Sequence, residues 1–167
     1  MKIIDLPPKE LDQIAFARYG IFLDLNETKK TGSGPDFTWW REVIPNDFDK
    51  GVSFGMVEAV PTDEKRVTFL ERHKMTKEIL VFTNQGGILT AAKADNNAER
   101  PELDTIASFR VKAGTIVVLD EGVWHSTPIA IQKSVKALII FKKNTDKTDF
   151  EAVELADIAD VNYHIVL

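Results

Sequence analysis

The stretch GTIVVLDEGVWHST, from Gly114 to Thr127, decides the fold prediction. Its first half is rich in β-branched and apolar residues and is typical of a strand buried on both faces. Asp120-Glu121-Gly122 then interrupts the run with residues that favour tight turns. Strand character resumes at Trp124, so we expect a second strand that begins near His125.

Similar short segments fill most of the chain on either side of this stretch. They are rich in Val, Ile, Phe and Thr and are separated by glycine, proline or asparagine. Such spacing predicts an all-β sandwich or barrel, and the polar residues 93–104 predict an exposed loop. The predicted strands are residues 52–60, 66–73, 78–83, 87–92, 107–111, 115–119, 129–133 and 135–141.

The two ends of the chain are predicted differently. Residues 8–18 carry apolar positions at helical spacing, with Pro8 suited to a first helical turn and Gly20 to the position past its end. The tail fits either a helix or a strand with a turn. We therefore predict one domain over residues 1–167, with an N-terminal helix (1–20), a barrel core (52–143) and a C-terminal tail (144–167).

Composition excludes several classes of protein. The absence of cysteine excludes disulfides and thiolate chemistry. A net charge of −5 argues against a nucleic-acid partner, because phosphate binding needs a basic surface. The chain has no apolar run of about 18 residues and no signal-peptide pattern. We expect a cytoplasmic protein that does not associate with membranes.

The chain has three histidines, and two of them fall where a site is expected. Strand alternation puts His73 on the same face as Glu71, and Glu78 begins the next predicted strand. If the faces agree, His73 and Glu78 meet across a hairpin, and His125 joins them inside the barrel. Two imidazoles and one carboxylate suit a divalent metal, or a small substrate that they position and deprotonate. Each histidine alone equally fits ordinary packing, and His164 is expected to serve packing or solvent.

The spacing resembles the two motifs of the cupin family. The first motif, His-x-His followed after three or four residues by Glu and later by Gly, is similar to His73, Glu78 and Gly86, with Met75 in place of the second histidine. This resemblance implies a cupin-type antiparallel β-barrel, or jelly roll.

The second cupin motif is similar to the opening stretch. Gly114, Gly122 and His125 match its glycines and histidine, and Asp120 stands in place of its proline. The resemblance implies that residues 120–122 form the tight turn between two barrel strands and direct His125 inward.

A narrower resemblance is to the ureidoglycolate lyase family of cupins. Its fragments FARYG, LERH, PELDTIASF and VWH occur here in family order and cover nearly the whole chain. Members split ureidoglycolate into glyoxylate and urea, a step of allantoin degradation in purine catabolism, and are commonly homodimers. The resemblance implies a carbon–nitrogen lyase with a small-molecule substrate, which we expect to be a homodimer.

Four positions depart from that family. Ser126 stands where the family has a second histidine, Val118 and Leu119 replace Asn and Tyr, and Glu78 replaces Gln. The apolar pair removes two hydrogen-bond partners of a polar substrate. The charge of Glu78 favours a metal cation instead. These departures leave the true substrate open.

The candidate site residues follow from both lines of argument. We expect His73 and His125 to be catalytic, because a neutral histidine near its ordinary pKa can accept a proton. With Glu78 they are the expected ligands of a divalent metal of unknown identity. Arg72 lies on the opposite strand face and is expected to be structural. The candidate substrate-binding residues are Met75, Ser126 and Trp39.

Two other functions fit the same residues. One is a cupin that binds a small molecule without catalysis, and the other is a cupin enzyme acting on another small hydroxy acid, keto acid or sugar. Metal content and urea release distinguish the three.

Overall fold

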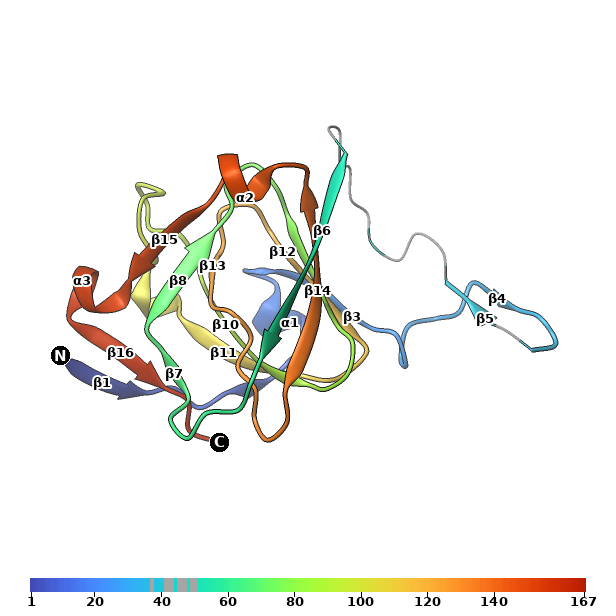
Figure 1. The fold of residues 1–167 in the computed structure, drawn as a ribbon, viewed down its shortest axis with the longest axis horizontal. Helices are drawn as coiled ribbons and strands as arrows, with labels where there is room; N and C mark the ends of the chain where they lie inside the picture. Colours follow the sequence, from blue (N-terminus) through green and yellow to red (C-terminus); the bar gives the residue numbers. More distant parts are fainter. Residues whose placement is uncertain (37, 41–43, 45–47, 49–50) are drawn as a thin grey trace.

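Two β-sheets face each other across the main core (Figure 1). The computed structural model describes residues 1–36, 38–40, 44, 48 and 51–167. Nearly all strand pairs in these ranges are antiparallel. Two pairs are parallel: β1 (Lys2–Asp5) with β16 (Val161–His164), and β2 (Lys9–Glu10) with β11 (Ala107–Val111). The expected all-β class is confirmed. No helix in the described ranges is long and apolar enough to cross a membrane.

The first of the two main sheets has six strands. Their order is β15 (Glu151–Glu154), β8 (Phe69–Arg72), β13 (Trp124–His125), β10 (Gly87–Ala92), β11 (Ala107–Val111) and β2 (Lys9–Glu10).

The second main sheet has five strands. Their order is β3 (Gly20–Asp24), β12 (Thr115–Leu119), β9 (Glu78–Phe82), β14 (Val135–Lys142) and β6 (Val52–Ala59).

Shorter elements complete the chain. Three strands, β1 (Lys2–Asp5), β16 (Val161–His164) and β7 (Arg66–Val67), form a small sheet. Two more, β4 (Gly32–Ser33) and β5 (Thr38–Trp39), form a hairpin. The helical segments are α1 (Gln13–Phe16), η1 (Leu103–Thr105), α2 (Thr145–Thr148) and α3 (Leu155–Ala159).

The apolar strands are explained by cores on both sides of a sheet. In β9, Leu80 and Phe82 point into the core between the two main sheets, whereas Ile79 packs into a cluster on the outer face. Val118 of β12 belongs to the same outer cluster. Alternate side chains of a strand face opposite ways, so a strand with a core on each side needs apolar residues throughout. The prediction that 115–119 is a central strand is confirmed.

The turn in the opening stretch forms as expected, but it joins strands of different sheets. Gly122 has φ +77°, and the N–H of Val123 donates to the carbonyl of Asp120 at 3.2 Å. The N–H of Gly122 donates to the carbonyl of His73 at 2.7 Å. The turn therefore carries the chain from the five-stranded to the six-stranded sheet.

The predicted hairpin between residues 66–73 and 78–83 is wrong. The first segment becomes β7 and β8, β8 pairs with β13 and β15, and β9 pairs with β12 and β14, so the two strands lie in opposite sheets. The reason lies in the connection: the N–H groups of Lys74 and Met75 both donate to the carboxylate of Asp149 at 2.8 Å. These donors are satisfied by a side chain, and the chain crosses between the sheets.

The N-terminal helix is shorter than predicted. Asp12 caps α1, because its side chain accepts from the N–H groups of Ile14 and Ala15 at 2.9 Å. The side chain of an N-cap aspartate accepts hydrogen bonds from the free N–H groups of the first turn, which a proline side chain cannot do. Residues 9–10 accordingly form β2, and Gly20 begins β3 instead of ending the helix.

Two further segments complete the comparison with the sequence. Residues 129–133 do not form the predicted strand: Ile129 makes one bridge to Ile88, and the chain then bends. The undecided tail contains both elements, with β15 followed by α3. The division into residues 1–20, 52–143 and 144–167 stays a prediction.

Gly20 is the glycine whose replacement the fold tolerates least. Its φ is +147°, and a Cβ there would overlap the carbonyl oxygen of Val118. We expect Gly20→Ala to lower the free energy of unfolding by more than about 2 kcal/mol, through strain and overlap with backbone that cannot move away. Urea denaturation measures this.

Gly55→Ala is the matched control. Its added Cβ would meet the Cβ of Ile139 at 3.8 Å, an ordinary contact. A change within about 0.5 kcal/mol is expected there. Equal stability of the two variants would contradict the described approach of β3 to β12.

Candidate metal and catalytic site

Three side chains from three segments meet between the two main sheets. His73 directly follows β8, Glu78 begins β9 and His125 ends β13. One ligand atom from each lies within 4.8 Å of the others, and the residues are 7%, 5% and 2% exposed. The expected convergence of these side chains is observed, between opposite sheets and not across a hairpin. Their roles as ligands or catalysts stay predictions.

The ring of His73 is held by the chain that follows α2. Its Nδ1 lies 2.6 Å from the carbonyl oxygen of Asp149. The side chain of the same Asp149 holds the next two backbone N–H groups, and Gly122 binds the carbonyl of His73. Both the backbone and the ring of His73 are thereby fixed.

The ring of His125 is held by its own strand. Its Nδ1 lies 3.1 Å from the carbonyl oxygen of Val123, just after the turn. In the sheet, His125 stands opposite Ala91 of β10 and Glu71 of β8. Its side chain therefore points across the space between the sheets toward Glu78.

These contacts settle the tautomers of both rings. A carbonyl oxygen can only accept a hydrogen bond, so Nδ1 carries a proton in both histidines. Nε2 of His73 and of His125 then face the same atom, Oε2 of Glu78, at 3.2 and 3.0 Å. If the rings are neutral, each presents a lone pair to an anionic oxygen. A proton or a metal cation is required among these three atoms.

The pKa values of the two histidines and of Glu78 are shifted by their mutual contacts. Burial lowers the pKa of each histidine, but contact with Glu78 outweighs it, so the pKa of both is raised above the ordinary 6.5. Burial likewise opposes ionisation of Glu78, yet the two histidines lower the pKa of its carboxyl to about 2. The carboxylate is therefore ionised at neutral pH and attracts whichever cation occupies the site.

The donor set fits a divalent cation. Two imidazole nitrogens and one carboxylate oxygen suit zinc, manganese or iron. Both histidines donate Nδ1–H to a backbone carbonyl, the arrangement that orients metal-bound imidazoles. Within the described part of the chain, Oε2 of Glu78 and Nε2 of His125 are buried without a hydrogen-bond partner. A bound cation would satisfy both atoms.

Glu71 is a site residue that the sequence analysis did not select. Its Oε1 lies 3.8 Å from Nε2 of His125. Burial and the nearby charge of Glu78 raise the pKa of Glu71. Two features of the sequence indicate Glu71. Strand alternation places it on the same face as His73, and four residues separate His73 from Glu78. That spacing makes His73 the second histidine of the cupin motif and places Glu71 at the first.

The candidate substrate-binding residues Met75 and Ser126 lie in different surroundings. Met75 is 56% exposed and lines a small surface pocket with Lys142, Thr145 and Asp149. With two residues between it and Glu78, Met75 does not occupy the position of a motif histidine. The side chain of Trp39 lies outside what the structure describes.

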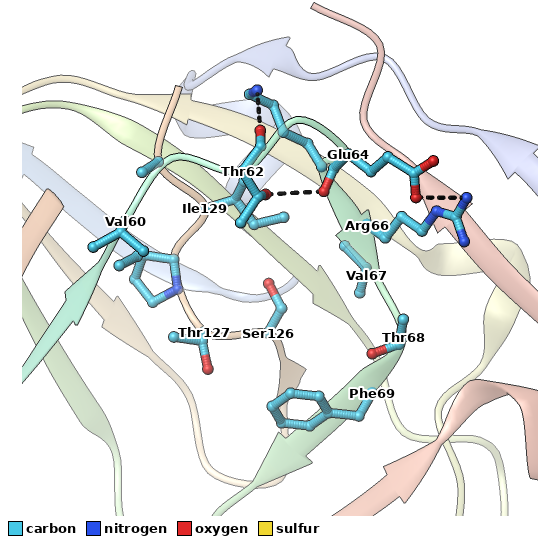
Figure 2. Close-up of a pocket in the computed structure, with 14 residues that line it drawn as sticks. Val60, Thr62, Glu64, Arg66, Val67, Thr68, Phe69, Ser126, Thr127 and Ile129 are labelled. Atoms are coloured by element: carbon cyan, nitrogen blue, oxygen red, sulfur yellow. Dashed lines mark hydrogen bonds and ion pairs between the residues drawn. The ribbon is translucent and has the colours of Figure 1, made fainter. Parts of the chain in front are cut away.

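Ser126 is buried and lines a pocket of about 350 Å³ (Figure 2). Its Oγ also lies 3.4 Å from the N–H of Thr90. Phe69 lines the same pocket and precedes Glu71 by two residues in β8, so both point to one face of the sheet. The pocket thus lies about 7 Å along β8 from the level of Glu71. Its other polar lining includes Thr68 and Thr127.

Two residues expected to lie outside the site do so. Arg72 stacks on Trp124, with 4.3 Å between guanidinium carbon and ring centre, and pairs with Glu151 at 2.6 Å. His164 is half-exposed and faces Asp5 at 3.4 Å. Neither residue is among the candidate metal ligands.

Two of the departures from the family pattern differ in their distance from the site. Val118 packs into the outer cluster, on the face of the sheet away from the histidines. Leu119 belongs to the main core and pairs with Glu78 in the sheet. Of these two residues, Leu119 alone borders the site, where it helps to bury the carboxylate.

Comparison with known proteins agrees with the site's motifs. The model of the ureidoglycolate lyase family matches residues 3–162. The chain belongs to the ureidoglycolate lyase family. No protein of curated function matches the chain.

Solved structures are also similar to the chain, and the first of the two named here bears on the fold. A dTDP sugar isomerase from Desulfovibrio desulfuricans G20 is similar with a TM-score of 0.51 at 10% identity, over 75% of this chain and 79% of that one. The oxalate decarboxylase of Bacillus subtilis is similar with a TM-score of 0.45 at 17% identity, over 65% of this chain and 25% of that one. The expected cupin-type fold is confirmed, as two facing sheets.

We expect metal affinity to fall as the pH is lowered. The pKa of both histidines is raised, so below that raised value a metal must displace their protons. The apparent affinity should drop by roughly tenfold per pH unit for each proton displaced. Titration with Mn²⁺ or Zn²⁺ between about pH 6 and pH 9 measures it.

His164→Ala is the control for this titration and should change nothing, whereas Glu78→Gln should lose the metal. An affinity that does not vary with pH would show that the ion is held without the histidines.

Proposed function

We propose that the chain is a cytoplasmic ureidoglycolate lyase, which eliminates urea from ureidoglycolate to give glyoxylate. The observation that carries the proposal is the pair of Nε2 atoms facing one buried carboxylate, in a chain of this family. The family supports the reaction class and the substrate, and the charge of Glu78 bears on whether a metal takes part.

The charges of the site favour a metal-dependent version. Glu78 is ionised at neutral pH, so the bare site would repel the carboxylate of ureidoglycolate. His73, Glu78 and His125 would hold a divalent cation, whose two positive charges exceed the single negative charge of Glu78 and would attract the substrate's carboxylate. When bound, such a cation would take the substrate's carboxylate and hydroxyl as ligands and acidify the hydroxyl.

The elimination requires two proton movements. The hydroxyl loses a proton as its oxygen becomes the carbonyl of glyoxylate, and the departing urea nitrogen gains one as the carbon–nitrogen bond breaks. Glu71 is suited to move these protons, because its raised pKa lets it accept one proton and give it back. Without a metal, an unprotonated histidine would take this role.

The pocket of Figure 2 suits the uncharged end of the substrate. Its wall offers the hydroxyls of Thr68, Ser126 and Thr127 beside the ring of Phe69. Hydroxyl groups both donate and accept, as a urea group requires. We infer that Ser126 contributes there, next to His125 in the chain.

The test is urea release from ureidoglycolate by the metal-loaded protein. His125→Ala should abolish both metal retention and urea release, while circular dichroism stays unchanged. Glu71→Gln should keep the metal and lose at least about 100-fold in kcat, the size of a general acid–base contribution. His164→Ala is the control and should behave as the wild type.

The other outcomes identify the competing functions. Metal retention without urea release would favour a cupin enzyme acting on another small hydroxy acid, keto acid or sugar. The absence of both would favour a binding protein. Loss of folding in His125→Ala with the metal retained would make His125 a packing residue.

We also propose a homodimer formed through the free edge of β6 and the exposed side chains beside that edge. Phe54 and Met56 on this strand are 67% and 64% exposed, and β6 is the last strand of its sheet in the part of the chain that the structure describes. A two-fold axis beside β6 would pair it with a second copy, because the edge of an antiparallel strand complements itself. The ion pair of Glu58 and Lys136, with 3.7 Å between its charged atoms, would lie at the rim of this dimer interface.

Light scattering should accordingly give about twice the chain mass of 18.8 kDa. Phe54→Lys should shift it to the monomer, because a charge would be buried in the interface. Ile14→Lys, at a residue 90% exposed elsewhere, is the control and should remain dimeric. A wild-type protein of 18.8 kDa would refute the dimer.

A further inference from the structure

A second pocket lies behind the turn that carries His125. Its volume is about 490 Å³, and the turn residues 120–122 with Val123 form one wall. Its lining does not include His73, Glu78, His125 or Glu71. The opposite walls carry four basic residues from separate parts of the chain: Arg18, Arg72, Lys74 and Lys93.

These basic residues are not neutralised locally. Arg72 and Lys74 share a single carboxylate, that of Glu151, at 2.6 and 2.5 Å. Arg18 and Lys93 form no ion pair with a carboxylate among the residues that the structure describes.

The pocket wall contains fewer acidic than basic residues. Asp120 is paired with Lys77 at 2.8 Å, and Glu121 is the other carboxylate in the wall. The four cations are therefore opposed by two carboxylates, Glu121 and the shared Glu151, which leaves an excess of two positive charges. This excess stands out on a chain whose net charge is −5.

We propose that this pocket binds a compact dianion, such as a phosphate group or a dicarboxylate. Two charges would balance the excess. Arginine presents a planar set of donors that matches oxyanions, and lysine adds a point charge. Arg72 is 2% exposed and stacked on Trp124, so one cationic wall is already fixed before a ligand arrives.

The pocket also adjoins the parts that hold both site histidines. Lys74 follows His73 in the chain, and Val123 supplies the carbonyl that orients His125. The N–H of Gly122, in the same wall, binds the carbonyl of His73. A ligand in this pocket would therefore contact the backbone that positions the site, from the side away from Glu78.

Isothermal titration with inorganic phosphate and, separately, with succinate tests the proposal. The double variant Arg18→Ala/Lys93→Ala should bind at least tenfold more weakly, because it removes the two cations without a carboxylate partner. The double variant Lys2→Ala/Lys133→Ala, at exposed lysines outside the pocket, is the matched control and should bind as the wild type. Affinity should fall with added salt.

A further variant separates this pocket from the metal site, where anions can also bind. The Glu78→Gln variant should lose the metal yet bind phosphate or succinate as before. If Glu78→Gln fails to fold, the same measurement is made on His125→Ala. Binding of phosphate alone, or of succinate alone, would support the pocket and identify the oxyanion class. No binding of either, equal binding by the two double variants, or loss of binding with the metal would overturn the proposal.

Discussion

The contact between the carboxylate of Glu78 and two imidazoles is the constraint on which the rest of the site depends. A carboxylate that is 5% exposed is tolerated in a protein interior only when its charge is matched. Both matching groups come from the opposite sheet, His73 beyond the end of β8 and His125 in β13. A polar contact thus joins the two sheets beside the apolar core, and removing any partner leaves the others buried and unmatched.

Much of this arrangement could be predicted from the sequence, because strand alternation is a local property. It placed His73 and Glu71 on one face of the strand, and the Asp120–Gly122 turn was recognised from its composition. Alternation does not say which strands pair, however. The hairpin between 66–73 and 78–83 was predicted because the segments are adjacent, whereas the carboxylate of Asp149, far along the chain, takes the donors of the connection.

The remaining errors also have physical causes. The cupin motif was aligned one histidine out of register, which gave Met75 a place that belongs to no ligand and hid Glu71. The capping strength of Asp12 outweighed the proline at position 8 and shortened the helix to four residues. Residues 129–133 have strand composition, but they make a single bridge and bend. For the helix a side-chain contact decided the outcome, and for the motif a shift of one position did, neither of which composition reveals.

The bond between His73 and the carbonyl of Asp149 joins residues 76 positions apart. During synthesis the chain emerges from its N-terminus, so His73, Glu78 and His125 all leave the ribosome before Asp149 does. Until then the carbonyl of Asp149 does not hold Nδ1 of His73, so the fold does not yet fix the tautomer or the orientation of that ring. The site is therefore completed late, by a segment that contributes no ligand. A chain that stops before Asp149 therefore contains all three candidate metal ligands but lacks the carbonyl that orients the ring of His73.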